Sequence, residues 1–184
     1  LMTRVAACQI SLSIENPAGN ISHANQGIAE AISHGAQIIV LPELTNSGYV
    51  FTSVSEVQDR STTLDGEIIS QWKEIAHKND VVIVAGLALS VESRLYNASV
   101  IIDKSGLLGW YAKAHLFGEE HQFFKSGEKP PLVVNTAHGR IATMVCYDVE
   151  FPEWVRLAML DRAALLAVPT NWPNLGQLIH GTPM

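Results

Sequence analysis

Charged residues are scarce in this sequence, and no region concentrates charge of one sign. Of the 184 residues, 16% are charged and 47% are hydrophobic, whereas a typical soluble domain has about 25% charged residues. This composition excludes a disordered chain, which would bury too little apolar surface to offset its ordering entropy. The net charge is −6, and Lys and Arg form no cluster of the kind that binds phosphate backbones. We therefore expect a globular protein with no nucleic-acid partner.

Cysteine is nearly absent. Cys8 and Cys146 could form at most one bridge, which excludes a small scaffold held together by several disulfides. Neither cysteine stands in a CxxC or Cys/His spacing typical of metal sites. We expect no bound metal.

Long hydrophobic runs are also missing. The most apolar stretch, residues 81–91, is much shorter than the ~18–20 residues that a membrane-spanning helix requires. The first four residues lack the charged region, hydrophobic region and cleavage site of a signal peptide. We expect a cytoplasmic protein that does not associate with membranes.

What the sequence does contain is an alternation of short apolar runs and longer amphipathic stretches. Apolar residues at three- and four-residue spacing predict helices, and β-rich runs bounded by Gly, Pro or Asp predict strands. The expected helices are residues 21–34, 68–78 and 152–162, and the expected strands are 5–10, 37–41, 81–87, 96–102, 107–112, 132–136, 140–145 and 165–168. Turn sequences at 103–106 and 138–139 predict two hairpins. No linker or internal repeat divides the chain, so residues 1–184 are expected to form one α/β domain.

Two of the predicted strands end in charged side chains. Glu43 follows strand 37–41, where burial would raise its pKa toward values useful for a general base; a solvated loop carboxylate is the alternative. Lys113 ends strand 107–112 among aromatic and aliphatic neighbours. It could stabilise a developing oxyanion, or simply extend its stem along the surface.

A third strand end carries Cys146, between strand 140–145 and helix 152–162. The positive end of the helix dipole is expected to favour its thiolate. A buried, inert cysteine is the alternative, and it is the preferred interpretation for Cys8. A carboxylate, an ammonium and a thiol together supply the parts for nucleophilic acyl chemistry.

Three segments around these side chains carry a resemblance to a known family. They are residues 41–44 (Leu-Pro-Glu-Leu) with 48–49, residues 111–117 (Tyr-Ala-Lys-Ala-His-Leu-Phe) with 120 and 124–127, and residues 146–153 (Cys-Tyr-Asp-Val-Glu-Phe-Pro-Glu) with 156 and 169–172. In this order they resemble the motifs of the nitrilase superfamily, the carbon–nitrogen hydrolases with a Glu-Lys-Cys triad. The resemblance spans residues 4 to about 173, and three long motifs in register are far more specific than one short motif.

The resemblance implies a four-layer αββα sandwich and assigns roles to the site residues. Glu43 would be the general base, Lys113 would stabilise the tetrahedral intermediate, and Cys146 would be the nucleophile. Glu120 would orient Lys113 or assist the hydrolytic water, and the N–H of Tyr147 would join the oxyanion site. The remaining motif positions would contact substrate (Tyr49, Asn171 and Trp172) or support the cysteine turn (Asp148, Glu153, Arg156 and His115).

The implied reaction needs no metal or organic cofactor. The substrate would lose ammonia or an amine, and water would hydrolyse the thioester left on Cys146. The family commonly assembles through the helix after the cysteine, so a homodimer or larger homo-oligomer is expected. Family catalytic domains also continue well past residue 184, so we expect the C-terminal strands and helices of the fold to be absent from this chain.

The residues after the nucleophile favour one branch of the family. Cys-Tyr-Asp at residues 146–148 resembles amidases and carbamoyl hydrolases, whereas true nitrilases often have Cys-Trp-Glu. A small carboxamide is therefore the expected substrate, with a nitrile or an N-carbamoyl compound as alternatives. Two other classes stay open: a non-catalytic interaction subunit, and a Cys–His hydrolase that uses His115 or His138.

Overall fold

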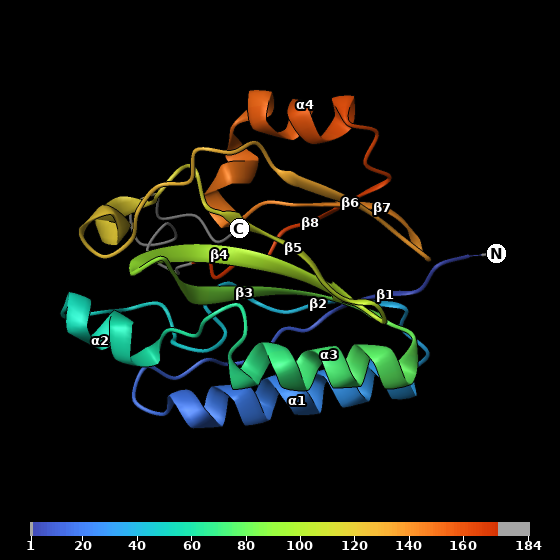
Figure 1. Ribbon diagram of the computed structural model, residues 1–184, viewed down its shortest axis with the longest axis horizontal. Coiled ribbons are helices and arrows are strands. Elements are labelled where there is room, and N and C mark those ends of the chain that lie inside the picture. The colour runs from blue at the N-terminus through green and yellow to red at the C-terminus, as the bar shows by residue number, and fades with distance from the viewer. Residues whose placement is uncertain (1, 173–184) are drawn as a thin grey trace, which may run out of the picture.

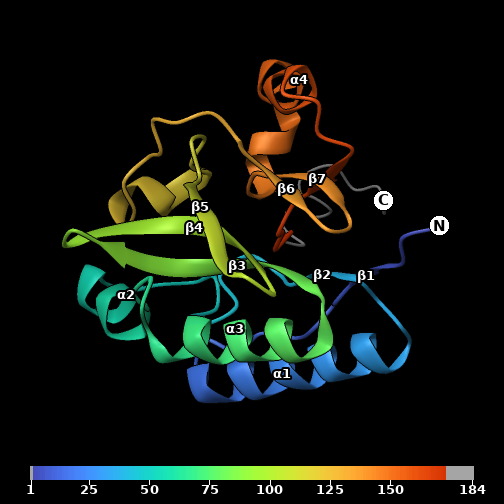
Figure 2. The ribbon, with the colours of Figure 1, turned by 45° about the vertical axis from the view of Figure 1, so that its right-hand side comes forward.

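The computed structural model describes residues 2–172, which form four layers (Figure 1). Helices α1 (Pro17–Ser33) and α3 (Glu67–Asn79) lie side by side on the outer face of the first sheet, and α4 (Pro152–Leu160) covers the outer face of the second (Figures 1 and 2). The two sheets face each other. This arrangement confirms the expected αββα sandwich; the expectation about the end of the chain concerns residues outside the described range.

The first sheet has five strands in the order β1-β2-β3-β4-β5. Its strands are β1 (Val5–Ala7), β2 (Ile38–Val40), β3 (Val82–Val91), β4 (Arg94–Asp103) and β5 (Gly106–Ala112). Neighbours from β1 to β3 are parallel because helices connect them, whereas β3, β4 and β5 form antiparallel hairpins. The hairpin predicted around residues 103–106 is therefore confirmed.

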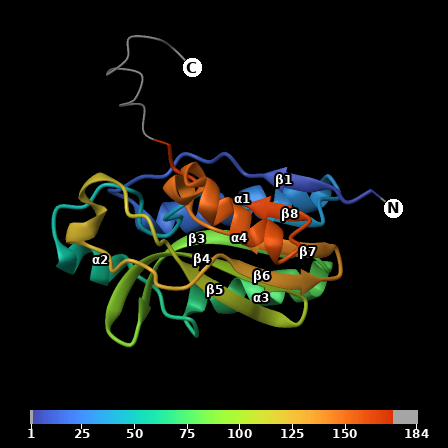
Figure 3. The same ribbon diagram turned by 90° about the horizontal axis from the view of Figure 1, so that it is seen from above.

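The second sheet has three strands in the order β6-β7-β8. They are β6 (Leu132–Thr136), β7 (Gly139–Thr143) and β8 (Leu165–Ala167). Strands β6 and β7 form the second predicted hairpin, and α4 connects β7 to its parallel neighbour β8. Seen from above, α4 lies over this sheet (Figure 3).

Apolar side chains fill the space between each pair of layers. One cluster joins α1 and α3 to the first sheet through Ile28, Trp72 and Ile83. Another joins the two sheets through residues that include Ile101 and Ile141. Strand 37–41 is continuously apolar because helices cover one face of its sheet and a second sheet covers the other.

Helix α2 (Val54–Arg60) is the element that the hydrophobic pattern did not predict. It is short and polar, and Val57 is its buried residue. Local contacts stabilise it: the Ser53 side chain accepts a hydrogen bond from the Glu56 N–H, and Glu56 pairs with Arg60 at 2.6 Å. A helix held by its cap and one ion pair leaves no apolar periodicity in the sequence.

Other differences lie at the ends of elements. Helix α1 begins at Pro17, earlier than expected, because the Asn16 side chain caps it by accepting from Gly19 N–H. Strands β3 and β4 extend to a two-residue turn at Glu92 and Ser93, with φ of 49° and 62°. This turn has the positive φ pair of a type I′ hairpin without the usual glycine. Within residues 2–172, every helix is too short or too polar to cross a bilayer.

Candidate active site

Glu43, Lys113 and Cys146 meet at the carboxyl ends of three strands. Glu43 follows β2, Lys113 follows β5 and Cys146 follows β7. Lys113 Nζ lies 2.7 Å from Glu43 Oε1, and the Cys146 thiol forms a hydrogen bond with the Glu43 side chain. Residues that are far apart in the sequence therefore share one site between the two sheets.

The loop that carries Glu43 packs tightly against β3. Gly86 N–H donates to Pro42 O at 3.1 Å, and Thr45 N–H donates to Gly86 O at 2.9 Å. A Cβ at Gly86 would lie only 2.5 Å from the Glu43 Cα, so a glycine is required for this approach. The Glu43 side chain is fully buried, and its burial raises its pKa above the ordinary value.

Lys113 lies between two carboxylates. It is 0% exposed, which makes the alternative of a surface lysine wrong, and its Nζ also lies 2.9 Å from Glu120 Oε1. Burial opposes the charged form, but the charges of Glu43 and Glu120 outweigh it and raise the pKa of Lys113. The ammonium therefore stays protonated inside the protein.

Glu120 is itself held by neighbouring donors. Its Oε1 accepts the Tyr49 hydroxyl at 2.7 Å, and its Oε2 accepts Phe117 N–H at 3.0 Å. These contacts place Glu120 beside Lys113, as the resemblance implies. They also place the hydroxyl of Tyr49, expected to contact substrate, on Glu120.

Asn97 is a site residue that sequence reasoning missed. It lies in β4, is fully buried, and donates through Nδ2 to Glu43 Oε1 at 2.7 Å and to Glu120 Oε1 at 3.3 Å. Its Oδ1 accepts no hydrogen bond from any described residue, an omission that costs about 1–3 kcal/mol for a buried acceptor. The available signal was an asparagine inside an apolar strand, where that residue is disfavoured.

Cys146 sits at a strained turn. Its φ is 44°, in the left-handed region that non-glycine residues rarely adopt, and Leu44 beside Glu43 has φ 53°. Such strain often gathers at functional sites. The turn is held by Asp148, whose Oδ2 accepts from Val145 N–H at 3.2 Å and from the Tyr111 hydroxyl at 2.8 Å.

The expectation that a helix dipole favours the Cys146 thiolate is wrong. Burial first, and the charge of Glu43 second, raise the pKa of Cys146 to about 12, although Lys113 acts in the opposite direction. The local helix at Cys146–Glu150 is a short 3-10 turn, and α4 begins only at Pro152. Cys146 is therefore a thiol at neutral pH, and a base must remove its proton before it can attack.

His115 supports the cysteine turn. Its Nδ1 lies 2.7 Å from Asp148 Oδ1, and its ring stacks on Phe151 with 3.7 Å between centroids. His138 lies at the start of β7, the end opposite Cys146, where its ring bonds to Gln37 and to the Asp80 carbonyl. The described contacts therefore place Glu43 beside the Cys146 thiol, in the position that the Cys–His alternative would require of a histidine.

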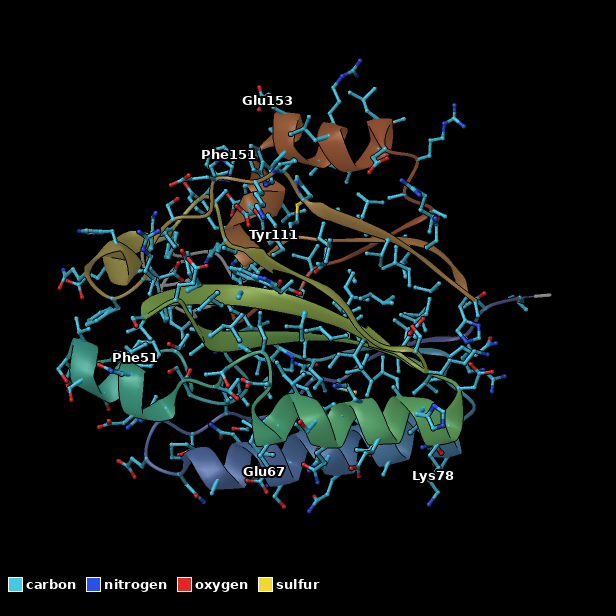
Figure 4. All side chains as sticks on the ribbon, in the orientation of Figure 1. Phe51, Glu67, Lys78, Tyr111, Phe151 and Glu153 are labelled. Carbon is cyan, nitrogen blue, oxygen red and sulfur yellow. The ribbon has the colours of Figure 1, made fainter. Side chains whose placement is uncertain are left out.

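Glu153 and Arg156 do not reach the cysteine turn. Both are exposed on α4, and Glu153 projects from the outer side of the helix (Figure 4). The face of α4 that packs inward carries Ala158 and Val155 instead. The expectation that Glu153 and Arg156 fix the turn is therefore corrected; Asp148 and His115 make the contacts that it required.

The remaining predicted residues lie around the triad. Asn171 N–H donates to Glu43 Oε2 at 3.0 Å, and Tyr147, directly after Cys146, is half-buried. Trp172 is 50% exposed. Asn171 and Trp172 line a cavity of about 550 Å³ together with Pro42 and Cys8. Among the described residues, no group of three or more His, Cys, Asp or Glu side chains could hold a metal ion.

These observations define an αββα protein whose site combines a buried thiol, a carboxylate that accepts its hydrogen bond, and an ammonium shared by two carboxylates. The chain belongs to the carbon-nitrogen hydrolase family, whose model matches residues 4–181.

Relatives with known names or structures resemble the chain over most of its length. A nitrilase of Pyrococcus abyssi is 36% identical over 171 residues, which cover 92% of this chain and 65% of the relative. A 2-oxoglutaramate amidase of Bacillus subtilis is 34% identical over 96% of this chain and 67% of its own. The crystal structure of an amidase from Nesterenkonia sp. has a TM-score of 0.78 and 29% identity, covering 97% of this chain and 68% of that one. The chain thus spans about two thirds of the length of these relatives.

Proposed function

We propose that this protein is a cysteine-dependent hydrolase that converts a small carboxamide to a carboxylate and ammonia through a thioester on Cys146. The observation that carries the proposal is the position of Glu43. Its fully buried carboxylate bonds to both the Cys146 thiol and the Lys113 ammonium. A base, a nucleophile and a fixed positive charge therefore surround one point.

In the first half-reaction, Glu43 accepts the thiol proton and the sulfur of Cys146 attacks the amide carbon. The carbon–sulfur bond forms and the carbonyl electrons move to oxygen, where Lys113 and the Tyr147 N–H stabilise the negative charge. When the tetrahedral intermediate collapses, the carbon–nitrogen bond breaks. Glu43 returns its proton to the departing nitrogen, which leaves as ammonia.

In the second half-reaction, water attacks the thioester carbon. Glu43 accepts a proton from this water, and the carbon–sulfur bond breaks as the acid forms. The proton then returns to the sulfur of Cys146, so the enzyme is regenerated and the net reaction consumes one water.

The electrostatics of the site suit these proton transfers. Burial raises the pKa of Glu43, which makes the carboxylate a stronger base than a solvated one. Glu120 remains beside Lys113 at 2.9 Å, so the ammonium keeps one carboxylate partner when Glu43 is protonated. The positive charge is therefore held in place throughout the cycle.

Named relatives support amide hydrolysis. The Bacillus subtilis relative is a 2-oxoglutaramate amidase. One structure of the Nesterenkonia amidase shows covalent addition of the acetamide moiety of fluoroacetamide at its active-site cysteine. The name of the Pyrococcus abyssi relative, a nitrilase, favours nitriles as the second candidate, because the same thiolate can attack a nitrile carbon.

The test compares ammonia release from short aliphatic amides and from the matching nitriles by the purified full-length protein. We expect the amides to react faster, and we expect Cys146→Ala to abolish release from both. Faster reaction of the nitriles would exchange the two candidates. A wild-type protein that releases no ammonia from either series would instead support a non-catalytic interaction subunit.

A further inference from the structure

We propose that Asn97 is a positioning residue that holds Glu43 so that its Oε2 atom accepts the proton of Cys146. The inference rests on the proposed function and deepens it by adding a residue to the same site. Asn97 comes from β4, a strand that contributes none of the three triad residues.

The argument begins with how the two oxygens of Glu43 are occupied. Oε1 accepts two hydrogen bonds, from Lys113 Nζ and from Asn97 Nδ2, both at 2.7 Å. A carboxylate oxygen offers about two lone-pair positions in its plane, so Oε1 is saturated. Oε2 accepts Asn171 N–H at 3.0 Å, which leaves it one position for the thiol proton.

Asn97 also compensates for an imbalance of charge. Glu43 is faced by Lys113, Glu120, the Cys146 thiol and the Tyr49 hydroxyl. One ammonium thus serves two carboxylates whose Oε1 atoms both contact it. The Asn97 amide donates to the same two Oε1 atoms, and it adds these hydrogen bonds without adding a charge.

The orientation of the amide shows which contacts determine it. Turning the group over would place Oδ1 against the oxygens of both Glu43 and Glu120, where acceptors would repel one another. In the observed orientation, Oδ1 is buried and accepts no hydrogen bond from residues 2–172. A residue present only for packing would not carry an unsatisfied buried oxygen, so the two carboxylates account for the asparagine.

The sign of the expected pH effect follows from this contact. The hydrogen bond from Asn97 stabilises ionised Glu43 and lowers its pKa, against the larger effect of burial. Removing Asn97 therefore raises the pKa of Glu43 further. Because the base works only when ionised, the acidic limb of kcat/KM must move to higher pH.

The test uses Asn97→Ala and Asn97→Leu, the second of which keeps most of the buried volume. We expect kcat to fall about 10- to 100-fold in both variants, the range for slight misplacement of a reacting group. KM should change little, and the acidic limb should move up by about one pH unit, the effect of one hydrogen bond to a charged group. A folded Asn97→Leu protein with wild-type kcat and an unmoved acidic limb would overturn the proposal.

Ser99→Ala is the matched control. Ser99 is buried two residues further along β4, and its hydroxyl pairs with Thr143 Oγ1 at 2.7 Å rather than with a carboxylate. We expect this variant to melt at a lower temperature without moving the acidic limb. If Ser99→Ala moves the limb as far as Asn97→Leu does, the effect belongs to β4 as a whole and the proposal fails.

A second readout separates this inference from the proposed function. The rate of Cys146 alkylation by iodoacetamide reports the ionisation of neighbouring Glu43 without requiring turnover. If wild-type protein releases no ammonia from amides, the proposed function fails, yet the Asn97→Leu substitution should still move the Glu43 inflection of the alkylation profile to higher pH. An inflection at the same pH in wild-type and Asn97→Leu proteins would contradict the inference alone.

Discussion

Replacing Glu43 with glutamine keeps the shape of the side chain but removes the base. Glu43→Gln can no longer accept the proton of a thiol whose pKa is raised to about 12. We expect kcat to fall by about 10²- to 10⁴-fold, the usual contribution of a positioned general base. Ammonia release from a short amide measures this loss directly.

The same substitution should make Cys146 easier to ionise. The negative charge of Glu43 and its hydrogen bond both raise the pKa of the thiol, and neither effect survives in the glutamine variant. The inflection of the iodoacetamide alkylation rate should therefore move below about 12, while turnover is lost. A slower catalyst with a more acidic thiol is a combination that general unfolding of the site would not produce.

The cost in stability should be moderate. Lys113 loses the partner at 2.7 Å but keeps Glu120 at 2.9 Å, so we expect less than the ~3–5 kcal/mol lost when a buried ion pair is broken outright. Glu128→Gln is the control, since this carboxylate pairs with Lys125 at the surface with 81% of its side chain exposed. Wild-type turnover in a folded Glu43→Gln protein would refute the assignment of Glu43 as the base.

Three further outcomes follow from the geometry. Gly86→Ala should lower kcat about 100-fold, because its Cβ would lie 2.5 Å from the Glu43 Cα and must displace the base; Gly27→Ala, whose Cβ meets only ordinary contacts at 3.6 Å, should leave turnover unchanged. Tyr49→Phe should lower kcat by roughly 10-fold through loss of one charge-assisted hydrogen bond to Glu120, and an unchanged rate would contradict that contact's role. The acidic limb of the kcat/KM profile should lie above pH 4.5, because burial raises the pKa of Glu43 from its ordinary 4.5; a limb below this value would show that Glu43 is not the base.

The sequence was sufficient to predict the parts of the site that lie at strand ends. Glu43, Lys113 and Cys146 each follow an apolar run, and a rigid sheet aims such residues at a common edge. The two hairpins were predictable for a related reason, because a turn of suitable residues fixes the pairing of its flanking strands.

What could not be predicted depends on packing between distant segments. Asn97 lies in the middle of a strand, and only the pairing of β3 with β4 and the approach of the Glu43 loop bring its amide to two carboxylates. The pKa of Cys146 was expected in the wrong direction because burial, a tertiary property, outweighs the local dipole. Glu153 and Arg156 occupy motif positions, but the register of α4 turns them toward solvent.

The most direct test of the mechanism is to detect the acyl group on Cys146. The full-length protein would be mixed with a short aliphatic amide, quenched in acid within the first turnovers, and measured by intact mass and peptide mapping. We expect one acyl group per chain, located on the peptide that contains Cys146, unaffected by Cys8→Ser and absent from Cys146→Ala. Ammonia release at the wild-type rate by the Cys146→Ala protein, or an acyl group found only on Cys8, would contradict the account.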